Sequence, residues 1–256
     1  MKHVVYCILH DVRDPMRGVL PPGVESAPVF LVAEGGLAAA CSVAPDACAT
    51  PTVPRATAFA WVVAALHKVA AVVPFRYGNF LDSGERVLNL LRVHREEFLR
   101  SLEEVEGCDE MGLRILRENC PHLACARPAY AAPGGAGREY LEGRRAHYAA
   151  EECDEAPALR TGGAAAEARG ALEGLAVKCR EDRSRAADGR LLSLFFLVRR
   201  ENVERFREAF GQLQQETSAK MLLTGPWPPY NFVPGTATAR AVAIGSLCSD
   251  GRAERD

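Results

Sequence analysis

The order of apolar patterns along the first half of the chain constrains its fold more than any other feature. Val4 to Leu9 is a short β-branched run that is apolar on both faces, which predicts a central strand. Two further apolar runs, Val29 to Ala33 and Leu37 to Ser42, flank the segment Glu34-Gly35-Gly36. Because glycine takes positive φ at little cost, this arrangement predicts a β-hairpin.

Helical patterns alternate with strands after the hairpin. Apolar residues recur at helical spacing from about Thr57 to Ala71, after a loop over Pro45 to Pro54, and predict an amphipathic helix. Val72 to Arg76 predicts a short strand. Asp82 and Glu85 form a variant capping box before a second helix. The apolar stripe of that helix is Val87, Leu90, Leu91, His94, Phe98 and Leu102.

The alternation of Met111, Leu113 and Ile115 predicts one more strand. The order β-β-β-α-β-α-β predicts an α+β sandwich, close to a ferredoxin-like fold, with the helices on one face of a single sheet.

The second half of the chain begins after a change of composition. Cys120 to Gly137 is rich in Pro, Gly and Ala and predicts a linker, whereas Arg138 to Arg185 has a helical character. Leu191 to Val198 and Lys220 to Leu223 predict strands on either side of a helix, and the prolines that follow Gly225 are expected to end regular structure. The predicted division is an N-terminal α+β domain, a linker, a C-terminal helical and α+β domain, and a flexible tail, over residues 1–118, 119–136, 137–233 and 234–256.

Composition excludes several classes of protein. The chain has 256 residues, 48% of them hydrophobic, and a net charge of −2, which argues against binding to nucleic acid by bulk phosphate neutralisation. The most apolar stretch, Ala56 to Leu66, is too short to span a bilayer, and the N-terminus lacks the pattern of a signal peptide. We therefore expect a cytoplasmic protein, whose nine irregularly spaced cysteines are reduced thiols.

The sequence carries no motif of phosphate or nucleophilic chemistry. It has no phosphate-binding loop, no dinucleotide fingerprint and no nucleophile elbow. Cys120, His122 and Cys125, with Cys108 upstream, are zinc-ligand types, but no C-x2-C pair accompanies them, so scattered thiols and a loop histidine are the favoured interpretation.

Other polar groups have simple structural explanations. His67 adjoins Lys68 near a helix end, where a cation complements the helix dipole, and His94 lies on an apolar stripe. Both are expected to be packed, hydrogen-bonded residues rather than catalytic bases. The arginines of Arg199 to Arg207 alternate with glutamates, which is typical of a solvated face.

Several stretches together resemble the gas vesicle protein L/F family (GvpL/GvpF). They are Leu66 to Phe80, with Pro-Phe-Arg-Tyr-Gly-Asn-Phe at its end; Phe196 to Val198; and Leu222 to Val233, which contains Thr-Gly-Pro-Trp-Pro-Pro-Tyr. Gly137 to Leu141 and the hairpin at Gly35 to Ala39 also resemble the family, and the stretches occur in the same order as in the family. The resemblance covers most of the chain, and the last of these motifs is long and unusual in composition.

The resemblance implies a function in building gas vesicles, as an accessory or minor structural protein that contacts the small hydrophobic shell protein and other accessory proteins. It implies two modified ferredoxin-like domains, the second with additional helices, in the cytoplasm or on the gas vesicle. It implies no catalysis, metal, cofactor, nucleic acid, membrane or small-molecule substrate. The residues it marks as partner contacts or structural motifs are Pro74, Arg76, Gly78, Gly225, Pro226, Trp227, Pro228, Pro229 and Tyr230.

Two other hypotheses remain open at this stage. One is an enzyme with a small-molecule pocket between domains, and the other is a zinc-dependent binding module that uses Cys120, His122 and Cys125. Trp227, a large aromatic residue between prolines, could dock a partner or seal the end of a domain. Since the chain is poor in aromatic residues, we expect it to be buried.

Overall fold

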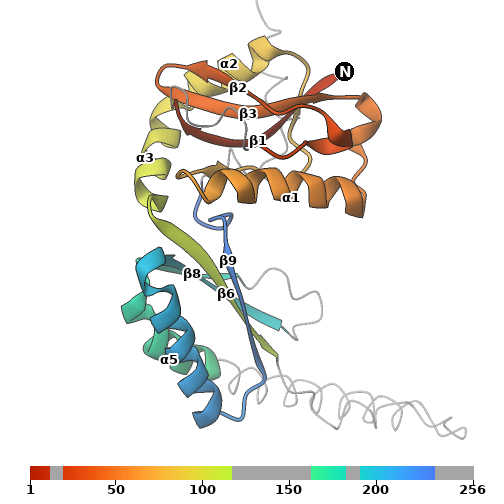
Figure 1. Cartoon of the computed structure of the whole chain (residues 1–256). Coiled ribbons are helices and arrows are strands. Elements are labelled where there is room, and N and C mark those ends of the chain that lie inside the picture. Colours follow the sequence, from red (N-terminus) through yellow and green to blue (C-terminus); the bar gives the residue numbers. More distant parts are fainter. Residues whose placement is uncertain (12–19, 117–162, 183–190, 234–256) are drawn as a thin grey trace, which may run out of the picture. The chain divides into compact units, whose positions relative to one another are not determined.

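The computed structural model describes residues 1–11, 20–116, 163–182 and 191–233, which form helices and two antiparallel sheets in an α+β arrangement (Figure 1). The chain divides into two compact units. Unit 1 comprises Met1–Glu110 and the chain from Pro226 onward, and unit 2 comprises Met111–Gly225. The predicted linker, 119–136, and the predicted tail, 234–256, lie outside the described residues.

The sheet of unit 1 has five strands: β1 (Lys2–His10), β2 (Phe30–Glu34), β3 (Leu37–Ala44), β4 (Val73–Pro74) and β5 (Phe80–Leu81). Its order is β2-β3-β1-β4, and β5 also pairs with β1. The predicted central strand and hairpin are therefore both present, and the positive φ values of Gly35 (60°) and Gly36 (85°) form the turn. The β5 strand is too short to leave a periodic signal.

The central strands are buried on both sides. Val4 to Leu9 of β1 have no exposed surface, and β3 lies against β1 through the small residues Ala38 to Ala40. A bulge at Tyr6 interrupts the register between Val5 and Cys7. Burial of both faces requires a layer on each side, so the prediction of helices on one face only is wrong for this sheet.

Three helices cover this sheet: α1 (Val53–His67), α2 (Gly84–Val93) and α3 (Arg95–Val105). The α1 helix contacts β1, while α2 and α3 contact the sheet through all four of its main strands. The first helix begins four residues earlier than expected, because Thr52 caps it and a proline is tolerated in a first helical turn.

The predicted second helix is two helices. Ser83 caps α2 by accepting a hydrogen bond from the backbone N–H of Arg86 at 3.3 Å. At His94 the backbone leaves the helical region, with φ −106° and ψ 19°, and α3 starts at the next residue. The apolar stripe continues through this break, which is why sequence periodicity did not show it.

Short 3₁₀ turns complete the described elements. They are η1 (Val24–Ser26), η2 (Asp46–Ala49), η4 (Glu173–Leu175) and η5 (Arg200–Asn202).

The sheet of unit 2 has the order β7-β8-β6-β9. Its strands are β6 (Cys108–Leu116), β7 (Lys178–Asp182), β8 (Leu191–Arg199) and β9 (Met221–Trp227). Residues 163–172 and α5 (Val203–Glu216) are helical and pack their apolar side chains against Met111, Leu113 and Ile115 of β6. The chain passes from unit 1 to unit 2 within β6 and returns at the end of β9. The prediction that the strand at Met111 belongs to a single sheet with the first strands is therefore wrong, because β6 pairs with β8 and β9.

Two predictions for this half are wrong. Residues 178–182 form a strand and not a helix, because they pair with β8 despite having almost no apolar residues. Regular structure does not stop at Gly225, since β9 continues to Trp227. An edge strand tolerates Pro226, because its missing N–H leaves only one ladder position without a donor.

Candidate functional site

The segment after α1 forms a tight corner on the edge of the unit 1 sheet. Pro74 lies on edge strand β4 opposite Cys7, a position where proline is tolerated, and the N–H of Phe75 bonds to the carbonyl oxygen of Tyr6 at 2.8 Å. Gly78 has φ 114°, in a region that residues with a side chain rarely adopt. Asn79 closes the turn by donating from Nδ2 to the carbonyl oxygen of Arg76 at 2.8 Å.

The segment after β9 is anchored in the same unit. Pro228 and Pro229 are buried, and the backbone turns back on itself through a bond of 2.8 Å from the N–H of Tyr230 to the carbonyl oxygen of Pro228. Phe232 and Val233 are 4% and 6% exposed, and Val233 belongs to the core of unit 1. This segment therefore fixes the end of the described chain to the N-terminal core.

A polar cluster joins the two segments. Arg76 donates from Nη2 to Oδ1 of Asn231 at 3.1 Å. The Glu110 carboxylate accepts from the backbone N–H of Asn231 at 2.7 Å and from its Nδ2 at 2.6 Å. Because Glu110 is 4% exposed, these charge-assisted bonds offset the cost of burying its charge. We call Arg76, Glu110 and Asn231 the anchor cluster.

Tyr230 lies against the same core. Burial is the main cause that raises the pKa of its hydroxyl above the usual value, and the nearby Arg76 opposes the shift. The side chain is therefore protonated at neutral pH and acts as a packing residue with a polar tip.

The structure brings together most of the residues that the sequence marked. Pro74, Arg76 and Gly78 build the corner, and Pro228, Pro229 and Tyr230 build the anchored segment. Gly225 ends unit 2, with φ 115° and its carbonyl oxygen 3.3 Å from Nη2 of Arg207. Sequence reasoning missed Asn231 and Glu110; Asn231 directly follows the tyrosine of the last motif, but nothing local distinguishes Glu110.

Trp227 is not buried, contrary to the expectation from composition. Its exposed fraction is 54%, and Pro226 beside it is also exposed. The buried positions are instead those of Pro228 and Pro229, so the prolines supply the packing and the indole is left at the surface. A large aromatic ring on a backbone restricted by three prolines loses little entropy on binding, which suits a contact residue.

His67 and His94 have the packed, hydrogen-bonded environments that the sequence predicted. His67 is 7% exposed and its Nε2 lies 2.7 Å from Oδ1 of Asp109. His94 has Nδ1 at 3.1 Å from Oε2 of Glu97, and its ring packs on Phe98.

The described ranges hold no group of three His, Cys, Asp or Glu side chains that could bind a metal ion. Cys108 is buried in them. Cys120, His122 and Cys125 lie outside these ranges, so the structure does not test the zinc hypothesis.

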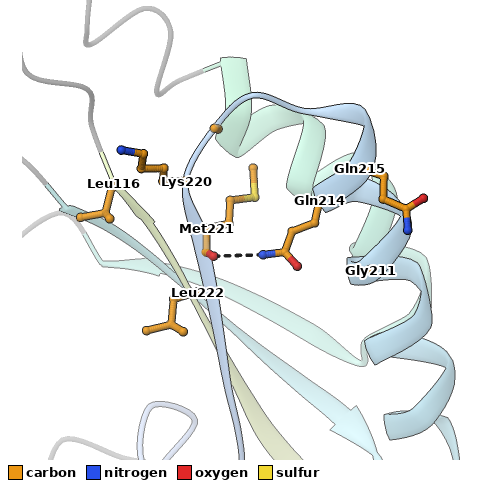
Figure 2. A pocket seen from close by; sticks show the side chains of 8 residues that line it. Leu116, Gly211, Gln214, Gln215, Lys220, Met221 and Leu222 are labelled. Atoms are coloured by element: carbon orange, nitrogen blue, oxygen red, sulfur yellow. Dashed lines mark hydrogen bonds between the residues drawn. The ribbon is translucent and has the colours of Figure 1, made fainter.

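Unit 2 has a surface depression of about 630 Å³ between the end of α5 and the start of β9 (Figure 2). Gln214 spans part of it and donates from Nε2 to the carbonyl oxygen of Met221 at 3.3 Å. The lining residues are Leu116, Gly211, Gln214, Gln215, Ala219, Lys220, Met221 and Leu222. Lys220 is the one titratable side chain among them, so this lining does not pair a nucleophile with a base.

Comparison with known proteins adds an independent line of evidence. A sequence model of the family described as "Gas vesicle synthesis protein GvpL/GvpF" matches residues 3–234. Gas vesicle protein L of Streptomyces sp. (strain CB03234) is 28% identical over 244 residues, covering 88% of this chain and 91% of the relative. Gas vesicle protein F of the same strain is 28% identical over 237 residues, covering 87% of this chain and 94% of the relative.

Two solved structures share the fold. The crystal structure of the gas vesicle protein GvpF from Anabaena sp. PCC7120 aligns with a TM-score of 0.74 at 15% identity, over 91% of this chain and 96% of that one. The GvpF structure from Microcystis aeruginosa aligns with a TM-score of 0.70 at 15% identity, over 90% of this chain and 98% of that one. At this identity the likeness concerns the fold alone.

Proposed function

The chain belongs to the gas vesicle synthesis protein GvpL/GvpF family, and from this premise we propose that it is an accessory or minor structural component that contacts the small shell protein during gas vesicle assembly. The family is one of gas vesicle structural or assembly proteins and is not a known class of enzyme. We accordingly propose that the chain has no catalytic activity and requires no cofactor.

The exposed indole of Trp227 is the observation that carries the proposed contact. Binding hot spots are enriched in tryptophan, and the indole is apolar enough to pack against a hydrophobic protein. The anchor cluster and the buried Pro228 and Pro229 hold the adjacent backbone in place, so the ring is presented from a fixed support. In this proposal Trp227 and Pro226 touch the partner, and the remaining motif residues position them.

Partners and location follow from the same proposal. The partners are the shell protein and other gas vesicle accessory proteins, with no nucleic acid, membrane or small-molecule substrate, and the chain acts in the cytoplasm and on the gas vesicle. In the part of the chain that the structure describes, no helix is long and apolar enough to cross a membrane. We also propose that both units are modified ferredoxin-like folds; each has an antiparallel sheet packed by helices, which supports this.

Co-purification with the shell protein tests the contact. Tagged full-length chain, expressed together with the shell protein, should retain it. Trp227→Ala should raise the dissociation constant of the complex by at least about 30-fold, the effect of a binding hot spot, and so retain clearly less shell protein. Leu222→Ala is the matched control, because Leu222 is a similarly exposed apolar residue on the same strand, at 57%. Equal retention by the wild type and Trp227→Ala would refute the proposed contact.

A further inference from the structure

The sheet of unit 1 has an edge at β2, which pairs with β3 and with no other described strand. In an antiparallel pair, alternate residues of an edge strand direct their backbone N–H and C=O groups away from the neighbouring strand. The two-residue turn after β2, with positive φ at both glycines, makes Glu34 and Leu37 a hydrogen-bonded pair. By this alternation Leu31 and Ala33 point their backbone groups outward, so the edge offers two donors and two acceptors.

This edge lacks the protection that sheet edges normally have. Proteins block such edges with charged side chains, prolines, bulges or covering groups. On β9, at an edge of the unit 2 sheet, Gln214 donates to the carbonyl oxygen of Met221 and Arg207 to that of Gly225, both at 3.3 Å. Among the described residues no such bond reaches the outward groups of β2, and the strand contains no lysine or proline. Ala33 is exposed, so the edge is open to solvent.

We propose that β2 is a self-association edge, on which the β2 strand of a second copy of this chain pairs in antiparallel orientation and joins the two sheets into one. Two donors and two acceptors at this spacing are the pattern that another extended strand matches. A two-fold interface places the same segment of each copy against the other, so the strand must be complementary to itself. This inference concerns unit 1 alone and does not depend on the contact with the shell protein.

The backbone of β2 meets that requirement in one register. If the two-fold axis passes through Val32, the central residue of the strand, all five residues of β2 lie across from β2 residues of the second copy. Leu31 then pairs with Ala33 of the second copy, and Ala33 with its Leu31. Each of these two pairs exchanges two hydrogen bonds, so the four bonds use every outward group of both strands. An axis one residue away in either direction leaves part of each strand unpaired.

The side chains of β2 favour a second copy in the same register. Glu34 is the one charged residue of the strand, and it lies across from Phe30, so the two Glu34 carboxylates do not meet. Each carboxylate keeps the ion pair that it already forms within its own copy, with Oε1 2.8 Å from Nε of Arg92. At the axis the two Val32 side chains form a cross-strand pair of β-branched residues, which stabilises antiparallel sheets. No charge is left without its counterion.

Sedimentation of the full-length chain over a range of concentrations tests the proposal. One strand pair is at the small end of stable interfaces, so we expect a dimer with a dissociation constant on the order of 10 µM. Ala33→Pro removes an outward N–H but no bond to β3, which an edge strand tolerates, and should raise the dissociation constant by at least about 10-fold. Ala33→Thr is the matched control, because it keeps the N–H and suits a strand, and it should dimerise like the wild type.

Amide hydrogen exchange locates the interface. In dilute solution the N–H groups of Leu31 and Ala33 bond only to water and should exchange rapidly. When about four-fifths of the chains are dimeric, their exchange should be about 5-fold slower, because only the remaining monomer exposes them. Val32 lies opposite Ala39 of β3, and its N–H, bonded to that strand, should exchange slowly at both concentrations.

Three results would overturn the proposal. One is a wild type that stays monomeric to about 100 µM, as when the edge pairs with a strand of a different protein. Another is a dimer in which the amides of Leu31 and Ala33 still exchange as rapidly as in dilute solution. The third is an Ala33→Pro variant whose circular dichroism matches the wild type and which dimerises equally well.

Discussion

Replacing Asn231 with alanine tests whether the anchor cluster holds the end of the described chain to unit 1. The substitution removes two side-chain hydrogen bonds: the one that Nδ2 donates to the buried Glu110 carboxylate and the one that Oδ1 accepts from Arg76. The backbone N–H of residue 231 still reaches Glu110, so the carboxylate retains one of these two donors.

The magnitude follows from the two bonds. A hydrogen bond to a charged group contributes about 1.5–3 kcal/mol, and the Arg76 bond, which is half-buried, contributes toward the lower end of that range. We expect Asn231→Ala to lower the free energy of unfolding by about 3 kcal/mol. For a chain of this size that corresponds to a fall of about 6–12 °C in the melting temperature of the transition that involves unit 1.

The assay is thermal and urea unfolding of the full-length chain, followed by near-UV circular dichroism. Asn202→Ala is the matched control, because Asn202 precedes α5 without a side-chain capping bond, and its loss should cost less than about 0.5 kcal/mol. If Asn231→Ala unfolds within 0.5 kcal/mol of the wild type, on the scale of an ordinary surface change, the anchor cluster does not stabilise this segment.

The remaining predictions use other positions of the same structure. Gly78→Ala should lower the free energy of unfolding by about 1–2 kcal/mol, because Gly78 has a positive φ. Gly211→Ala, in α5 with open space around a new Cβ, should instead raise it by about 0.5–1 kcal/mol. Chemical denaturation measures both values, and equal effects would refute the assignment of strain to Gly78. Burial raises the pKa of Tyr230 in the folded chain, so the contribution of its neutral hydroxyl to stability is complete below the pKa of the unfolded chain, near 10, and is lost as the pH rises above that value. Tyr230→Phe should therefore weaken the loss of stability above pH 10 in a pH-dependent melting series. An unchanged alkaline profile would contradict this. Trp227→Ala should change the free energy of unfolding by less than about 0.5 kcal/mol, since the indole is at the surface; a loss of several kcal/mol would show that the ring packs as a core residue.

Local patterns were sufficient where one element determines its own structure. The buried run at Val4 to Leu9 and the hairpin glycines each act within a few residues, and the structure has them where the sequence placed them. The start of the second helix was also predicted, but its cap is Ser83 and not Asp82. The alternation of Met111, Leu113 and Ile115 correctly predicted a strand with one covered face. It could not show which sheet the strand joins, because its partners β8 and β9 lie far along the chain.

Patterns failed where the partner lies far away in sequence. Lys178 to Asp182 is a strand because β8 pairs with it, and its charged sequence carries no sign of that partner. Arg76 and Asn231 are 155 residues apart, so neither motif alone could show that they bond. The exposure of Trp227 was missed for a different reason: composition favours burial of a tryptophan, but in this segment the buried positions are Pro228 and Pro229.

The most direct test of the central claim is gas vesicle formation in a host whose own copy of this chain is replaced by Trp227→Ala, with the amount of folded protein measured in the same cells. We expect the variant to accumulate to the wild-type level while vesicles are strongly reduced, because the contact with the shell protein is lost and the fold is not. Normal vesicle formation by Trp227→Ala would contradict the claim that the chain acts through this exposed residue.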